Sequence, residues 1–382
     1  MQKDFHYYAT YCAAILAGYS HEDSLVICAS AQMADLCTPT FLASVGGPRD
    51  AATTQSQTEL VDVNPDVVGL QTITRIWASF HFLPYDLYAE KPHCSRRYLS
   101  KYRLICKPNG PLVRETVALA RGRGLPAAGL AMHVLADTWA HQNFAGTPSL
   151  VINNTDAYFY ELLPGPDGET ERRLFFRHSP GKPDDLEKGL YTNTVYQFSE
   201  HSVMNLGHGR AGHLPDYSFM RYRYLPAWGE YAVCVKDNPS DYYQAFCQMI
   251  RALKALRGEA PEFEPDTYDY AAAAPYEERI RAILTKRQLD SCADWQAFGE
   301  TLSGRAVDDL DTDRLRDEYR RADAEAKGAT FLGQFFDAAI AQKSMVTNRI
   351  FRSGNLLAGF SLDDVQRSGR GWFRKGRKGG AA

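Results

Sequence analysis

Several features that would point to a familiar class of protein are missing from this chain of 382 residues. Its eight cysteines include no Cys-x2-Cys pair and have no regular spacing, which excludes a thiolate zinc ribbon. No run of apolar residues reaches the roughly 18 that a membrane-spanning helix needs. The net charge of −3 gives no general case for binding nucleic acid.

A secretory signal is also missing, because the N-terminus, Met-Gln-Lys-Asp-Phe-His, lacks a basic segment followed by an apolar one. We therefore expect a cytoplasmic protein, or one exported without a classical signal peptide. The cysteines are expected to be free thiols in a reducing compartment.

Stretches rich in helix formers, separated by Gly, Pro and polar residues, indicate a mostly α protein: a multi-helix bundle with long irregular loops. Predicted helices cover 4–18, 20–35, 70–83, 111–121, 127–141, 241–256, 276–287, 294–304, 312–327 and 329–351. Residues 43–66 and 84–110 are predicted to be loops, and short strands are expected near 172–177. The predicted organisation is a core of residues 1–256, a C-terminal helical part at 257–365 packed on it, and a basic flexible tail at 366–382.

The stretch around which the chain is organised is His133-Val-Leu-Ala-Asp137-Thr-Trp-Ala-His141. Its polar residues stand four apart, so they share one edge of a helix. The residues between them are apolar, which predicts that this edge faces the interior. Burying a carboxylate and two imidazoles is costly unless they are paired or bind metal. The pattern therefore favours a metal-binding face over the alternative, a hydrogen-bonded His–Asp network inside a helical core.

One metal ion cannot take all three side chains, because His133 and His141 lie about 12 Å apart along a helix axis. The spacing fits better if Asp137 bridges two ions, with His133 serving one and His141 leaning toward another. Such an arrangement requires further ligands elsewhere in the chain.

Candidates for these further ligands lie on both sides of the central stretch. His6, Asp35 and His81 fall within apolar segments before it. After it, the Gly-rich loop 205–216 carries His208, His213 and Asp216. The glycines of this loop match Gly-x-Gly-x-x-Gly, but a dinucleotide site would need a strand before them and a helix after them. Metal ligands on a tightly bent backbone are the better interpretation.

The chain resembles an uncharacterised family of metal-dependent hydrolase-like proteins, a domain of unknown function with the His-x3-Asp-x3-His motif. The matching stretches are Asp4–Tyr11, Phe80–Pro84, His133–Pro148 and Leu206–Asp216. More remotely, the order of these ligands is similar to that of the zinc-dependent phospholipase C and single-strand-nuclease fold, an all-helical domain with three zinc ions.

That remote resemblance implies a distribution of the ligands over the ions. One zinc would be held by Asp35, His81, His133 and Asp137, a second by His6 and Asp137, and a third by His141, one of His208 and His213, and Asp216. The known enzymes also use the amino group of an N-terminal Trp, whereas this chain begins with Met1. Either Asp4 substitutes for that amine, or the second zinc is weakly bound or absent.

The expected cofactor is Zn²⁺, two or three ions, and the candidate catalytic residues are Asp137 and His141. Zinc supplies hydroxide near neutral pH, and paired ions can clamp a phosphate ester. We therefore expect a phosphodiester hydrolase of the phospholipase C type acting on phospholipid head groups, with peripheral membrane contact through the basic tail. The alternatives are a zinc-dependent nuclease, which the acidic balance disfavours so that no nucleic-acid partner is expected, and a non-catalytic helical interaction protein.

Overall fold

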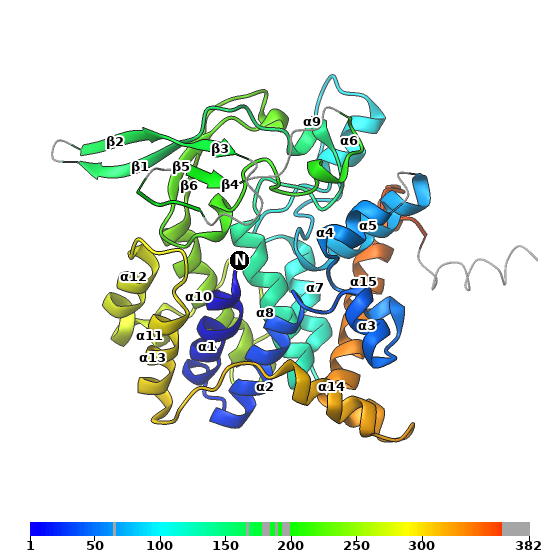
Figure 1. The fold of residues 1–382 in the computed structure, drawn as a ribbon, viewed down its shortest axis with the longest axis vertical. Helices are drawn as coiled ribbons and strands as arrows, with labels where there is room; N and C mark the ends of the chain where they lie inside the picture. Colours follow the sequence, from blue (N-terminus) through cyan, green and yellow to red (C-terminus); the bar gives the residue numbers. More distant parts are fainter. Residues whose placement is uncertain (64–65, 166–167, 178–183, 188–189, 193–198, 361–382) are drawn as a thin grey trace, which may run out of the picture.

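Helices make up most of the molecule, and a small antiparallel sheet lies over one end of them (Figure 1). The structure is a computed structural model that describes residues 1–63, 66–165, 168–177, 184–187, 190–192 and 199–360. The prediction of a mostly α protein is confirmed at this level. The predicted tail at 366–382 lies outside the described residues.

The helices are numbered in chain order, and the described strands all lie between α9 and α10. The first are the π-helix η1 (Asp4–Ala9), α1 (Thr10–Leu16), α2 (His21–Met33), α3 (Pro39–Val45), α4 (Gln57–Asp62) and α5 (Val67–Phe80). Next come α6 (Arg96–Tyr102), α7 (Pro111–Ala120), α8 (Leu125–Ala140), α9 (Leu150–Asn153) and α10 (Asn238–Leu256). The last are α11 (Tyr270–Ala273), α12 (Glu277–Thr285), α13 (Cys292–Ser303), α14 (Thr312–Arg321) and α15 (Phe331–Arg352).

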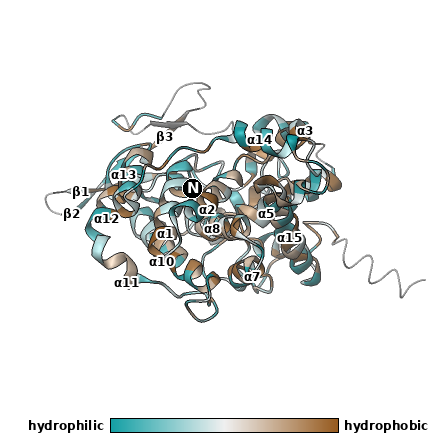
Figure 2. Ribbon diagram, turned by 90° about the horizontal axis from the view of Figure 1, so that it is seen from below, coloured by the Kyte–Doolittle hydropathy of each residue, from teal (hydrophilic) through white to brown (hydrophobic). Residues whose placement is uncertain are grey.

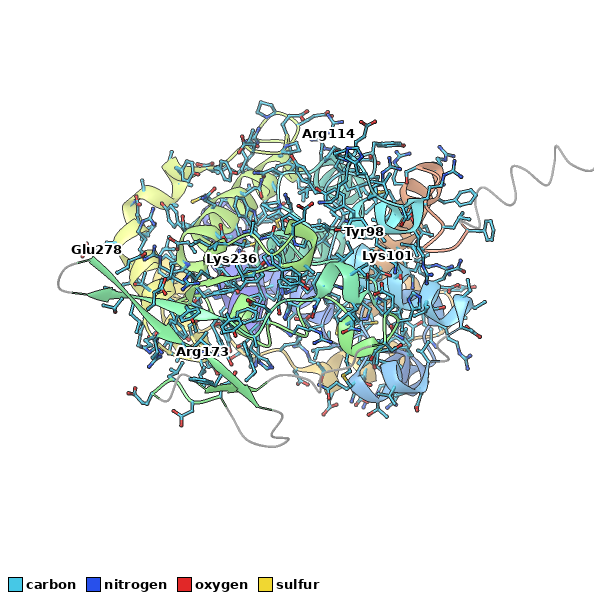
Figure 3. The ribbon with its side chains drawn as sticks, turned by 90° about the horizontal axis from the view of Figure 1, so that it is seen from above. Tyr98, Lys101, Arg114, Arg173, Lys236 and Glu278 are labelled. Carbon is cyan, nitrogen blue, oxygen red and sulfur yellow. The ribbon has the colours of Figure 1, made fainter. Side chains whose placement is uncertain are left out.

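The strands gather between α9 and α10. β1 (Tyr160–Gly165), β2 (Gly168–Arg173), β5 (Arg221–Tyr224) and β6 (Cys234–Asp237) form an antiparallel sheet in the order β2-β1-β5-β6. β3 (Phe175–Arg177) and β4 (Leu190–Thr192) pair in parallel beside it. Seen from above, Arg173 on β2 and Lys236 on β6 lie over the same half of the molecule (Figure 3).

Helix α8 is the central helix. All of its residues after Leu125 are buried, as expected for a helix that is apolar on every side. Figure 2 shows α8 in the middle of the helical layer, with α2, α5, α10 and α15 around it. The predicted helix at 127–141 is therefore present and contacts several other helices.

Helices α2 and α8 pack closely against each other, and Gly129 makes this approach possible. A Cβ at this position would lie 2.1 Å from the backbone oxygen of Ile27. The Ser30 hydroxyl crosses the same junction and donates to the carbonyl of Pro126 at 2.5 Å. The close contact fixes α2, which Asp35 follows by two residues, against the helix that carries His133.

Three short helices occur where the sequence indicated loops or irregular chain. Helix α4 lies within 43–66, α3 reaches into it, and α6 lies within 84–110. Each has a side-chain cap at its start, from Ser56, Thr38 and Ser95 respectively. Each capping hydroxyl accepts a hydrogen bond from a backbone N–H group of the first turn, which offsets the low helix propensity of the surrounding residues.

A continuous cluster of buried apolar side chains extends from Met1 to Ala358 and includes residues of α13 and α15. The C-terminal helices therefore share the core of the central helix. No described helix combines the length and the apolar character that crossing a bilayer requires.

Candidate metal centre

Histidine and aspartate side chains from distant segments meet along α8 and at its C-terminal end. They come from η1, from the segment after α2, from the end of α5, from α8 itself and from the loop before β5. They form three groups whose ligand atoms lie within 4.8 Å of one another: His6, His133 and Asp137; Asp35, His81 and His133; and His141, His208 and Asp216.

Asp137 connects the first two groups through its two oxygens. Oδ1 lies 3.1 Å from Nε2 of His6. Oδ2 lies 3.1 Å from Nδ1 of His81 and 3.2 Å from Nε2 of His133. The two oxygens of the carboxylate therefore face different histidines.

The third group forms where α8 ends. Nε2 of His141 lies 3.3 Å from Oδ1 of Asp216, and Nε2 of His208 lies 3.7 Å from Oδ2. The His208 ring is held beside Phe82 and His141 by a tight turn at Gly207, whose φ is +55°. A Cβ on Gly207 would lie 2.2 Å from the Phe82 ring, so a side chain at this position would push the loop away.

Backbone carbonyls fix which nitrogen faces the centre in three of the imidazoles, those of His81, His141 and His208. Nε2 of His81 donates to the carbonyl of Thr53 at 3.1 Å, so Nδ1 faces Asp137. Nδ1 of His141 donates to the carbonyl of His81 at 2.8 Å, and Nδ1 of His208 donates to that of Gly212 at 2.8 Å. Histidines that ligate a metal are oriented in this way by a hydrogen bond on the opposite nitrogen.

His6 supplies the test of whether a cation fits. The ring is fully buried, and neither of its nitrogens is in a hydrogen bond, although Nε2 points toward Asp137. Burial and the neighbouring His133 lower the pKa of His6 to about 4, so the ring is neutral at pH 7. A neutral buried imidazole without a hydrogen-bond partner is unfavourable, and a metal ion would provide the missing partner.

Two of the carboxylates, Asp137 and Asp216, are held in the ionised form that binds a cation. Burial opposes ionisation of Asp137, but His141 and the Met1 amine outweigh it and hold the pKa of Asp137 well below its usual range. The same balance, with His208 and the Met1 amine, lowers the pKa of Asp216. Burial raises the pKa of Asp35, whose side chain is 29% exposed. An ionised carboxylate is the form in which Asp137 and Asp216 would bind a metal ion, and a neutral imidazole is the form in which His6 would.

The α-amine of Met1 is the group that the sequence did not identify. It lies 2.9 Å from Oδ1 of Asp137, 3.0 Å from Nε2 of His141 and 3.3 Å from Oδ1 of Asp216. Figure 1 places the N-terminus beside the upper end of α8, below the sheet. Burial works against the charge, but Asp137 and Asp216 raise the pKa of the amine to about 10. The ammonium therefore lies where the first and third groups meet.

Asp4, the expected substitute for this amine, points elsewhere. Its carboxylate accepts a hydrogen bond from the Ser291 hydroxyl at 2.5 Å. The enzymes of the resembling fold use the amino group of their first residue, and that was the signal for Met1. Such an amine is present whatever side chain the first residue carries.

Of the two histidines left open on the loop, the structure brings only His208 to the centre. His213 is exposed, and its ring lies beside Tyr217 outside the three groups. Asp35, His208 and Asp216 keep 29%, 18% and 14% of their side chains exposed, while Asp137 keeps 1%. Solvent therefore reaches the centre past these three residues.

No curated protein and no solved structure matches the chain. The model of a family of unknown function, DUF6765, matches residues 1–350, and the chain therefore belongs to that family.

Proposed function

We propose that the protein is a metal-dependent phosphodiester hydrolase that holds two or three zinc ions in the three His/Asp groups. The observation that carries the proposal is the position of Asp137, whose two oxygens face different histidines. Metal pairs about 4 Å apart occur in enzymes that displace a group at phosphorus.

The residue types support a hydrolytic role for such ions. The three groups contain histidine and aspartate and no thiolate, which is the ligand set of catalytic rather than structural zinc. Bound zinc would supply hydroxide at neutral pH and positive charge for a phosphoryl oxygen. The partial exposure of Asp35, His208 and Asp216 marks the side from which a substrate would enter.

Phospholipid head groups are the proposed substrate class. The support is the ligand order, which remotely resembles that of the zinc phospholipase C fold, and the net charge of −3, which disfavours contact with many nucleotide phosphates. The aromatic rings nearest the third group, Phe82 and Phe144, are buried, so they pack against the histidines and do not add a cage for a quaternary amine.

A nuclease is the second candidate, because it would use the same ions.

The test is purification without chelator, elemental analysis, and parallel assays on phosphatidylcholine vesicles and single-stranded DNA. We expect at least two zinc equivalents and release of a water-soluble phosphate ester from the lipid. DNA cleavage without lipid turnover would assign the nuclease activity instead. Less than half an equivalent of any transition metal would overturn the metal centre and favour a non-catalytic protein.

A further inference from the structure

A buried connecting segment lies behind the group formed by Asp35, His81 and His133. Residues 51–55, Ala-Ala-Thr-Thr-Gln, are at most 7% exposed, although they join η2 (Arg49–Ala51) to α4. Connecting segments usually run over the surface, because their backbone polar groups need partners. The partners found here indicate why this segment is inside.

Thr53 contacts both sides of the metal group. Its hydroxyl donates to the carbonyl of Ala34 at 2.6 Å, directly before Asp35 in the chain. Its own carbonyl accepts the Nε2 proton of His81 at 3.1 Å. One residue therefore fixes the backbone beside one ligand and the orientation of another.

The segment is held from behind by Lys343 on α15. This side chain is 8% exposed, and its ammonium donates to the carbonyl of Ala52 at 3.2 Å. Two other buried lysines, Lys101 and Lys236, labelled in Figure 3, pair with the carboxylates of Glu200 and Asp241, and Lys236 also donates to the carbonyl of Trp139. The ammonium of Lys343 therefore fixes the backbone directly before Thr53.

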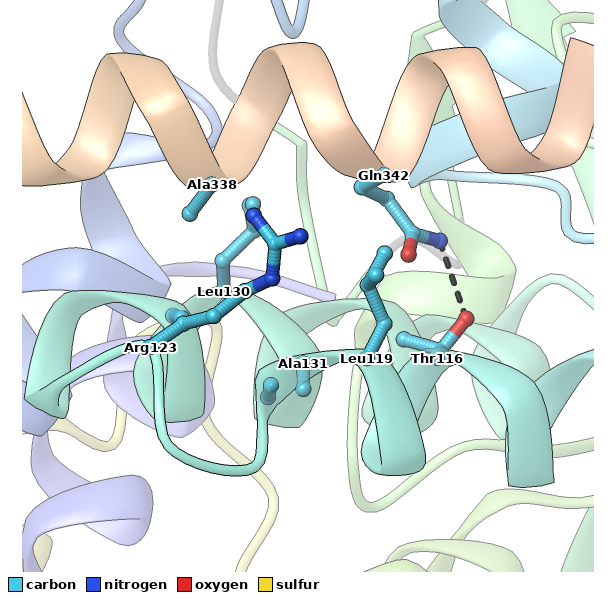
Figure 4. A pocket seen from close by; sticks show the side chains of 9 residues that line it. Thr116, Leu119, Arg123, Leu130, Ala131, Ala338 and Gln342 are labelled. Atoms are coloured by element: carbon cyan, nitrogen blue, oxygen red, sulfur yellow. Dashed lines mark hydrogen bonds between the residues drawn. The ribbon is translucent and has the colours of Figure 1, made fainter.

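The residue before Lys343 acts on the same region. Figure 4 shows Gln342 pointing from α15 toward Thr116 on α7, and its amide donates to the Thr116 hydroxyl at 2.9 Å. The same amide donates to the carbonyl of Ser79 at 3.2 Å, in the last turn of α5 before His81. Helix α15 is thus fixed against both the segment 51–55 and the helix that ends at His81.

We propose that Thr53, held in place by Lys343, is a positioning residue for the Asp35–His81–His133 group and sets the affinity of this group for metal. The inference rests on the metal centre proposed above. Thr53 has no such role toward the His141–His208–Asp216 group, because the two histidines of that group donate to the carbonyls of His81 and Gly212. Residues behind metal-ligating histidines typically contribute about 10- to 100-fold to metal affinity.

The experiment compares Thr53→Val, Thr53→Ser and Lys343→Met with the wild type. Zinc is removed from each full-length protein and returned in a calorimetric titration, followed by a Co²⁺ titration read by visible absorption. We expect Thr53→Val and Lys343→Met to weaken one binding step by about tenfold or more, with the other steps unchanged. Thr53→Ser keeps the hydroxyl and should bind as the wild type does.

Thr347→Val is the matched control. Thr347 lies one turn after Lys343 on α15, is 3% exposed, and has a hydroxyl without a hydrogen-bond partner. Its loss should leave all binding steps unchanged. Equal affinities in Thr53→Val and Thr347→Val, or equal losses in Thr53→Val and Thr53→Ser, would overturn the inference while the metal centre stood. A wild-type protein that binds no zinc would overturn both. Melting curves of all variants show whether a loss of affinity comes from unfolding.

Discussion

At the scale of single residues, Asp137 concentrates the most interactions. Its carboxylate lies within 3.5 Å of His6, His81, His133, His141 and the Met1 amine. A buried carboxylate costs several kcal/mol unless positive groups or ions surround it. The groups around Asp137 that offset this cost come from three parts of the chain: the N-terminal segment, the end of α5, and α8 itself.

Asp137→Asn should therefore remove at least one metal equivalent and lower kcat/KM by about a hundredfold or more, because an amide cannot bridge two cations as a carboxylate does. The helix should persist, since Asn preserves the shape of the side chain. Elemental analysis, the vesicle assay and circular dichroism measure these effects. His213→Ala, at an exposed histidine outside the groups, serves as the control and should change none of them. Full zinc content in Asp137→Asn would contradict a bridging role.

The Met1 amine offers a second test at this scale. Two residues added before Met1 convert the amine into an uncharged amide, which cannot pair with Asp137 and Asp216 at 2.9 and 3.3 Å. We expect a lower melting temperature of the metal-free protein, because the two carboxylates lose their cationic partner, and a zinc affinity that differs from that of the wild type. The same two residues added at the C-terminus are the control. Identical zinc affinity in the two extended proteins would show that the amine has no part in the centre.

The sequence identified the candidate ligands more completely than their partners. The four-residue spacing of His133, Asp137 and His141 follows from helix geometry and needs no knowledge of the fold. The sequence could not show which of His208 and His213 is the ligand. The turn at Gly207 that points the His208 ring inward depends on contact with Phe82, which is distant in the sequence. The Met1 amine was missed because its place depends on how η1 packs against the end of α8.

At the scale of secondary structure, long helices followed from composition, while α4 and α6 were missed. Both lie in stretches rich in polar residues and proline. The signal for α4 was present in Ser56 and Glu59, which form a capping box in the structure. The composition of the surrounding segment is typical of a loop, and a two-residue capping motif is a weaker signal than that composition.

The contact between α2 and α8 predicts the effect of Gly129→Ala. A new Cβ would lie 2.1 Å from the backbone oxygen of Ile27, so one helix must move. Overpacking of this kind costs about 1–3 kcal/mol. Because Asp35 follows α2, zinc affinity should fall as well. Gly328→Ala, with open space around it, is the control. Denaturant unfolding and zinc titration measure both effects, and an unchanged free energy of unfolding would contradict the close packing.

Helix α15 predicts a pH dependence through Lys343. Burial lowers the pKa of this lysine from 10.5 to about 8. Between these values the unfolded chain binds more protons than the folded one, so the free energy of unfolding should rise with pH, by about 3 kcal/mol in total. Lys343→Met has no titrating group at this position, so its free energy of unfolding lacks this rise with pH, and it should be at least as stable as the wild type at pH 7. The difference between the two proteins, measured from pH 7 to 10, should shrink or reverse. A constant difference would contradict the lowered pKa.

At the scale of the whole molecule, the metal centre joins segments that are far apart in the sequence. Five separate segments contribute to the adjoining groups of this centre, through Met1, Asp35, His81, Asp137 and Asp216. Positive ions at this point would neutralise carboxylates that the apolar core surrounds. Stability of the whole fold should therefore depend on whether the centre is occupied.

Removing metal with a chelator should lower the melting temperature by several degrees. An ion present at a hundred times its Kd adds about 2.7 kcal/mol to the free energy of unfolding when it binds only the folded chain. The metal-free protein should nevertheless stay folded, because the Met1 ammonium lies between Asp137 and Asp216 and takes over part of the neutralisation. Calorimetry before and after chelation, with metal loss checked by elemental analysis, measures the shift. Asp137→Asn should show a smaller shift than the wild type. An unchanged melting curve in wild-type protein that has lost its metal would contradict a buried centre.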